Sequence, residues 1–182
     1  MTADYLADPE ELAVWLPVGA DDPKLLVALS AASRRFRGAV RHPVSLVAAE
    51  TIVLDGSGAL SLLLPAAPVT DVASVTVDGQ TLTAGTDYTW SADGYLHRMG
   101  CAWPSTLRSV TVVYSHGYAD IPGDIQEVVI DQARAMYAIL PGVQQQTVGA
   151  QSVTFGVQAA TGVTAQWAAA VERYQLNRGE RP

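Results

Sequence analysis

The feature that most limits the fold of this chain is a strand that runs through a His-Gly-Tyr turn and a proline into a long helix. From Val110 to Ser115 apolar and polar residues alternate, which is typical of a half-buried strand. We expect Asp124 to cap the following helix, with Glu127 at its third position. The apolar residues of this helix recur at helical spacing: Ile125, Val128, Val129, Ala133, Met136, Ile139 and Leu140. The sequence therefore joins a β module directly to a packed helix.

Two more helices are predicted near the start of the chain. The pairs Asp8-Pro9 and Asp22-Pro23 each offer a capping carboxylate followed by a proline, which suits the first helical position. The first helix would carry a short apolar face made of Leu12, Trp15 and Leu16. The second would bury one side made of Leu25, Leu29, Ala32, Phe36 and Val40, and would end before Pro43.

Residues 44–118 have the pattern of short strands. Asp78-Gly79 lies between two apolar runs and favours a two-residue hairpin, because both positions tolerate a positive φ. Asp93-Gly94 separates two further short strands, and Gly56-Ser57-Gly58 is interpreted as another hairpin turn. Several strands at this spacing predict a small antiparallel sandwich or barrel.

These patterns predict an α+β fold with two domains. Residues 1–43 and 119–182 would form a helical core with a C-terminal strand (residues 151–155) and a last helix beginning at Thr164. Residues 44–118 would be a β domain inserted into that core.

Charge and composition exclude some classes of function. The net charge of −7 argues against a protein that binds DNA through its phosphates, since lysine and arginine supply that affinity. Only 16% of the residues are charged, which suits a subunit that hides much of its surface in an assembly. The acidic start of the sequence lacks the apolar region of a signal peptide, and Cys101 is the only cysteine. We expect a protein of the host cytoplasm before assembly, without a membrane segment.

No catalytic or metal site is predicted. The three histidines are not at ligand spacing from one another, and a zinc site needs three or four converging ligands. Ser115 and His116 are neighbours in a strand, so their side chains point to opposite faces and do not form a nucleophile–base pair. We therefore expect neither an enzyme nor a bound cofactor, and we interpret His116, Gly117, Tyr118 and Pro122 as a structural turn.

The densest group of basic residues is Arg34, Arg35, Arg37 and Arg41. Arg34, Arg37 and Arg41 share one helix face. They either complement the C-terminal end of the second helix and stay solvated, or form a docking patch for an acidic partner or for passing DNA.

Several motifs occur in an order that resembles the head–tail connector proteins (adaptors, or head-completion proteins) of long-tailed bacteriophages. A V-x-V-D-G hairpin lies at 75–79 and a V-x-Y-x-H-G-Y strand at 112–118. Tyr118-x-x-x-Pro122 then leads into Asp124-Ile125, and a G-x-x-S-V-T-F segment lies at 149–155. The resemblance covers most of the chain.

This resemblance implies a structural virion protein at the head–tail junction. Such proteins form a ring, typically of twelve copies, beneath the portal protein; the ring extends the DNA channel and docks stopper or tail-completion proteins. DNA would pass without specific binding. The portal or intersubunit contact would include Ser152, Val153, Thr154, Phe155 and Trp167.

Three alternatives remain open. One is another accessory ring protein of the head or tail, similar to a tail terminator. The second is a carbohydrate-binding β module that uses Trp90, Tyr95 and Trp103 as a platform. The third is a hydrolase that uses His116 or Asp120.

Overall fold

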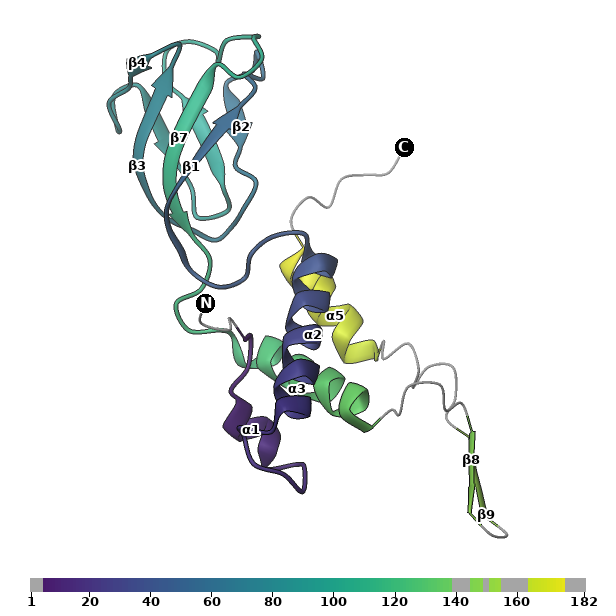
Figure 1. Ribbon diagram of the computed structural model, residues 1–182. Coiled ribbons are helices and arrows are strands. Elements are labelled where there is room, and N and C mark those ends of the chain that lie inside the picture. Colours follow the sequence, from purple (N-terminus) through teal and green to yellow (C-terminus); the bar gives the residue numbers. More distant parts are fainter. Residues whose placement is uncertain (1–4, 139–144, 149–150, 155–163, 176–182) are drawn as a thin grey trace. The chain divides into compact units, whose positions relative to one another are not determined.

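A computed structural model describes residues 5–138, 145–148, 151–154 and 164–175 (Figure 1). The chain divides into two compact units. Unit 1 combines Met1–Arg41 with Ile121–Pro182 and is mainly helical, whereas unit 2 is His42–Asp120 and consists of strands. The expected α+β class is confirmed.

Three of the helices in unit 1 begin at a residue whose side chain accepts a backbone hydrogen bond. Helix α1 (Pro9–Ala13) is capped by Asp8, and α2 (Pro23–Val40) by Asp22, as the two Asp-Pro pairs predict. Helix α5 (Ala165–Tyr174) is capped by Thr164, which accepts from the Trp167 amide at 3.1 Å.

Helix α3 (Gly123–Ala138) begins differently from the prediction. The Pro122 carbonyl accepts hydrogen bonds from the Ile125 and Gln126 amides, so the helix starts one residue before Asp124. Asp124 lies in the first turn and is not the cap, and the expected capping box with Glu127 is wrong. The Asp124 carboxylate instead accepts from the Ile125 amide and from two side chains of α5, described below.

The core of unit 1 is built around α2, which packs against α1, α3 and α5. Its predicted apolar side is fully buried: Leu25, Leu29, Ala32, Phe36 and Val40. The facing side of α3 buries Ile125, Val128, Val129 and Ala133, whereas Met136 is half-buried. Ile139 and Leu140, also expected on this side, lie outside the described residues.

Unit 2 is a sandwich of two antiparallel sheets. The larger sheet has the order β1-β7-β3-β4 and the smaller β2-β6-β5. The strands are β1 (Val47–Leu54), β2 (Ser61–Leu63), β3 (Val69–Val77), β4 (Gln80–Thr81), β5 (Tyr88–Trp90), β6 (Tyr95–Arg98) and β7 (Val110–His116). Their inner faces meet in a core that includes Leu62, Val75, Tyr88, Leu96, Trp103, Val112 and Tyr114.

Strand β7 is central to the larger sheet. Val112 lies opposite Ile52 on one side and Val75 on the other, and every second residue of β7 is buried. The alternation seen in the sequence is therefore the inward and outward alternation of this strand.

The turns confirm two predictions and correct a third. Asp93-Gly94 lies between the paired strands β5 and β6. Asp78 and Gly79 have φ angles of 47° and 85° and join β3 to β4 in a two-residue turn. Gly56-Ser57-Gly58 is not a hairpin turn, because it connects β1 to β2 and these strands belong to different sheets.

The two ends of unit 2 are held together by backbone hydrogen bonds. The Tyr118 amide donates to the Val44 carbonyl and the Leu46 amide donates to the Tyr118 carbonyl, both at 2.9 Å. Gly117 makes this pairing possible: its φ is +91°, and a Cβ there would collide with the Ser45 carbonyl oxygen.

In the C-terminal part of the chain, β8 (Gln145–Val148) pairs with β9 (Gln151–Thr154) as an antiparallel hairpin. The sequence predicts β9 but not β8, whose polar residues lack a strand pattern. Phe155 lies outside the described residues.

We predict that Gly117→Ala destabilises unit 2 by roughly 2–4 kcal/mol, because it combines a left-handed backbone with a collision. Gly79→Ala is the matched control: its φ is +85° but no atom lies within 4 Å of the added Cβ, so we expect only about 1 kcal/mol. Urea unfolding followed by circular dichroism compares the two. Equal losses would contradict the proposed role of the Ser45 contact.

Candidate assembly surfaces

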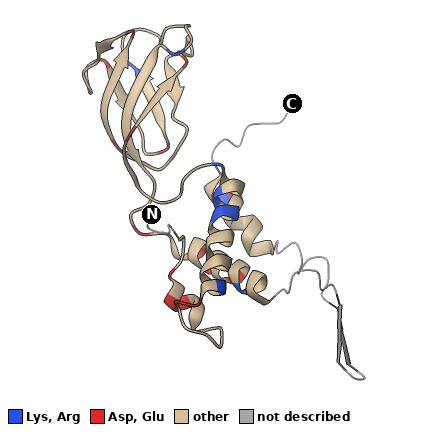
Figure 2. Cartoon of the chain, in the orientation of Figure 1, with Lys and Arg blue, Asp and Glu red and all other residues tan. Residues whose placement is uncertain are grey.

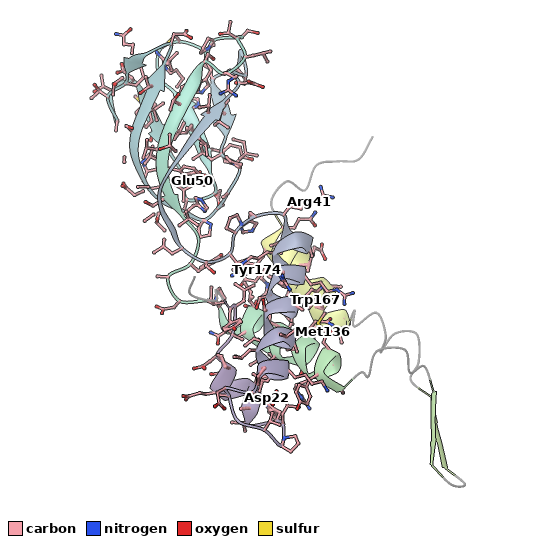
Figure 3. The ribbon with its side chains drawn as sticks, in the orientation of Figure 1. Asp22, Arg41, Glu50, Met136, Trp167 and Tyr174 are labelled. Atoms are coloured by element: carbon pink, nitrogen blue, oxygen red, sulfur yellow. The ribbon has the colours of Figure 1, made fainter. Side chains whose placement is uncertain are left out.

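Helix α5 is attached to unit 1 by one apolar and one polar contact. The Trp167 ring packs edge-on against the Phe36 ring of α2, with centroids 5.3 Å apart and an interplanar angle of 85°. The Asp124 carboxylate accepts from the Arg173 guanidinium at 2.7 Å and from the Tyr174 hydroxyl at 2.8 Å. Trp167 and Tyr174 are labelled on α5 in Figure 3. The first contact holds the start of α5 against α2, and the second holds its end against the start of α3.

The placement of Trp167 bears on its expected role as a portal or intersubunit contact. Its exposed fraction is 5%, so in the single chain the ring is part of the core of unit 1. A direct contact with another subunit stays a prediction. The structure does not describe the side chains of the other expected contact residues, which are Ser152, Val153 and Thr154.

The arginines predicted as a docking patch lie at the C-terminal end of α2 (Figure 2). Arg34 and Arg41 are exposed, and Arg37 is half-buried in the last turn. Arg41 follows the helix with a left-handed φ of 65°, and its amide donates to the Arg37 carbonyl at 2.8 Å. The positive charge is therefore placed where it complements the helix dipole and is also open to a partner.

Sequence reasoning missed a groove between α1 and α3, with a volume of about 490 Å³. The residues that line it include Glu11 and Trp15 from the α1 side and Glu127, Ile130, Asp131 and Arg134 from α3. The Arg134 guanidinium lies 4.8 Å from the centre of the Trp15 ring and is paired with Asp131 at 3.2 Å. The groove thus combines apolar surface with carboxylates.

Trp15 corrects the sequence interpretation. It was expected on the buried face of the first helix, yet 62% of it is exposed, because α1 ends at Ala13 and the chain leaves helical geometry before Trp15. Only Leu12 of the expected apolar face is fully buried.

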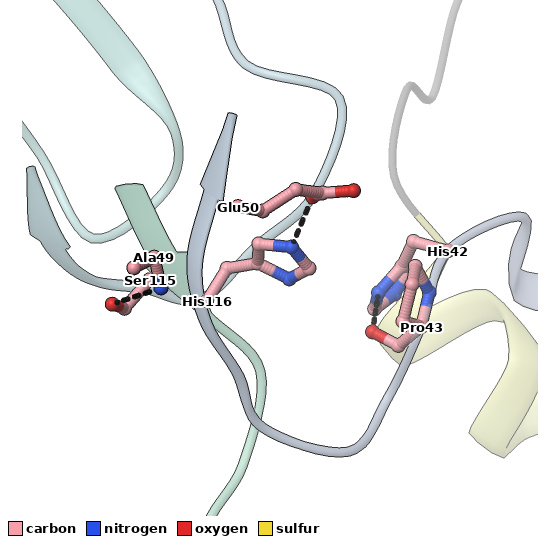
Figure 4. A network of polar contacts seen from close by, with 6 residues as sticks. All are labelled: His42, Pro43, Ala49, Glu50, Ser115 and His116. Atoms are coloured by element: carbon pink, nitrogen blue, oxygen red, sulfur yellow. Dashed lines mark hydrogen bonds and ion pairs between the residues drawn. The ribbon is translucent and has the colours of Figure 1, made fainter. Parts of the chain in front are cut away.

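His116 takes part in a structural network in unit 2 (Figure 4). Its Nε2 lies 2.7 Å from the Glu50 carboxylate, and its fully buried ring lies 4.8 Å from that of Tyr114. Burial, with a further contribution from Glu50, raises the pKa of Tyr114 to about 12. Ser115 points the other way, where its hydroxyl accepts from the Ala49 amide. The two residues thus occupy opposite faces, as the strand pattern predicts.

The aromatic residues proposed as a sugar platform do not lie on a common surface. Trp103 is 1% exposed and belongs to the sandwich core, Trp90 is partly buried against it, and Tyr95 is 53% exposed. The platform prediction is wrong for Trp103.

The described residues form neither a metal site nor a membrane-spanning helix. No three histidine, cysteine or acidic side chains in ranges 5–138, 145–148, 151–154 and 164–175 converge as metal ligands. Among the helices of the described chain, none is both long and apolar enough to cross a membrane.

No protein-family model and no curated protein matches the sequence. The fold is similar to chains of solved particles. One belongs to the neck of a native GTA particle computed with C12 symmetry, with a TM-score of 0.58 and 22% identity over 100% of this chain and 97% of that one. A second, in the neck of the empty GTA particle with C6 symmetry, has a TM-score of 0.57 and 23% identity, covering 96% and 92%.

A third similar chain is from the virion of a native gene transfer agent (GTA) particle, with a TM-score of 0.54 and 20% identity over 91% of this chain and 83% of that one. At these identities the comparisons establish a shared fold. They extend over both units of the chain.

We predict that Trp167→Ala destabilises unit 1 by about 3–5 kcal/mol, because it removes a large buried ring that packs against Phe36 of α2. Gln166→Ala is the matched control on the exposed side of the same helix and should change stability by less than about 0.5 kcal/mol. Urea unfolding measures both. Equal stabilities of the two variants would show that α5 is not held by this contact.

We also predict that the stability of unit 2 falls between about pH 10 and pH 12. The folded pKa of Tyr114 is raised above the unfolded value of about 10, so the unfolded chain loses this proton first and unfolding becomes more favourable as pH rises. The loss from this residue should reach at most about 3 kcal/mol. Tyr114→Phe should remove this part of the pH dependence of stability. Tyr95→Phe, at an exposed position, should leave the pH dependence unchanged. An unchanged slope in Tyr114→Phe would contradict the assignment.

Proposed function

We propose that this chain is a structural subunit of a bacteriophage neck, an adaptor that forms a ring beneath the portal protein. The observation that carries the proposal is the fold shared with GTA neck chains over both units. The motif order described in the sequence supports the same family. In this role the protein would extend the DNA channel and dock stopper or tail-completion proteins at the head–tail junction of the virion.

The symmetry of the similar assemblies supports a ring of twelve. The neck with a similar chain was computed with C12 symmetry in the native particle and with C6 symmetry in the empty particle. A cyclic ring multiplies weak contacts between subunits, so subunits that are monomeric alone can assemble on a portal template. The net charge of −7 suits a channel through which DNA passes without being retained.

The β8–β9 hairpin is the proposed contact with the portal or a neighbouring subunit. Within the described residues its strands pair only with each other. An isolated two-stranded hairpin is marginally stable in water, and each outer edge presents unpaired backbone groups that can take up another strand. Addition of a strand from a partner is a common mode of recognition and would stabilise this hairpin. Ser152, Val153 and Thr154 would then lie at the contact, followed by Phe155.

We predict that the purified chain adds a ring of twelve subunits to its cognate portal ring. Native mass spectrometry gives the added mass, and electron microscopy shows where the ring binds. A DNA-retardation assay at physiological salt should show no stable complex, in keeping with the acidic charge.

A chain lacking residues 143–157 is the matched variant, and it should fold but add to the portal poorly. A portal that ignores the full chain, while the chain binds tail tubes or closes into rings alone, would favour the accessory tail protein instead.

A further inference from the structure

The outward side of α2 has an unusual composition. Val27, Ala31, Arg34 and Gly38 follow one another at i, i+4, i+7 and i+11, which places them on one narrow stripe, and the exposed Arg41 adjoins it directly after the last residue of the helix. We call this stripe the α2 face. It lies opposite the buried side of the helix, which carries Leu25, Leu29, Ala32 and Phe36.

Packing inside the single chain does not account for the α2 face. Val27 is 66% exposed, and no atom lies within 4 Å of a Cβ built at Gly38. Glycine within a helix costs about 0.5–1 kcal/mol relative to alanine, and no described residue of unit 1 lies close enough to require it at this position. The small residues Ala31 and Gly38, on either side of Arg34, leave room for another surface to approach the helix backbone.

The groove between α1 and α3 has the complementary chemistry. Glu11 and Glu127 are exposed at its border, and Trp15 presents an exposed ring. Counting Glu11, Glu127 and Asp131 against Arg134, the lining carries a charge of −2. Guanidinium groups pair with carboxylates and stack on aromatic rings, as Arg134 already does on Trp15. The groove therefore fits an arginine-bearing helix.

We infer that the α2 face of one copy of this chain binds the α1–α3 groove of the next copy. The face and the groove are different surfaces of the same unit, so their contact is heterologous and builds a ring when the rotation between copies closes. This inference rests on the proposed ring. It commits to a second copy as the occupant, because the chain itself supplies both the positive and the negative surface.

Paired charge reversal tests the interface. One variant carries Arg34→Glu and Arg41→Glu, and the other carries Glu11→Arg and Glu127→Arg. Alone, each brings like charges together at every contact, so the fraction of subunits in rings on the portal should fall at least about tenfold. Mixed in equal amounts, the variants can alternate, since each contact then joins opposite charges. Rings of alternating composition should return, with masses that native mass spectrometry distinguishes.

The mixture also controls for misfolding, because a misfolded variant does not complement its partner. If each variant forms rings alone as the wild type does, or if the mixture does not recover, the inference is wrong while the proposed function stands. If the wild-type chain forms no ring with or without the portal, the proposed function fails and the inference fails with it.

A second variant addresses shape rather than charge. Gly38→Leu should leave the thermal stability of the chain unchanged or raised, because its side chain enters open space, yet it should abolish rings. Ala169→Leu is the matched control, since it adds the same side chain to an exposed position of α5 and should leave rings intact. Wild-type assembly by Gly38→Leu would overturn the inference.

Discussion

The helical unit depends on the buried side of α2. Helices α1, α3 and α5 all pack against it, although α3 and α5 follow only after the whole of unit 2 in the sequence. Five fully buried apolar residues on this side, from Leu25 to Val40, supply the area that brings these distant segments together. Phe36 is at the centre of this arrangement, because its ring also receives Trp167.

The hydrogen bonds of Asp124 determine where α5 sits along this apolar contact. Burial alone lets a helix slide along its partner, whereas a carboxylate shared by Arg173 and Tyr174 fixes which turn of α5 meets the start of α3. The same carboxylate is well placed near the positive end of the α3 dipole. One side chain thus complements the dipole of α3 and positions α5 along it.

Much of the fold could be predicted because local signals agreed with tertiary packing. The Asp-Pro pairs mark both early helices, the alternation of β7 survives because its inner side faces the core, and Asp78-Gly79 has the backbone that its turn requires. The errors arose where the partner lies far away in the sequence. A glycine-rich turn does not show which sheet receives the next strand, and the pairing of Asp124 with α5 has no local signature.

The candidate surfaces were predictable to different degrees. Charge density alone identified Arg34, Arg37 and Arg41. The groove was not foreseen, because Trp15 and Arg134 are brought together only by the packing of α1 on α3. Strand β8 was missed since its glutamines carry no apolar alternation.

The paired ends of unit 2 have an evolutionary consequence. Because Val44 and Leu46 are hydrogen-bonded to Tyr118, the sandwich leaves and rejoins the rest of the chain at neighbouring points. A module with adjacent termini can be gained, lost or exchanged through a short connection, and the helices of the other unit need not rearrange. The sequence of the sandwich can therefore change in response to its binding partners, while the sequence of the helices stays constrained by the packing of their own core.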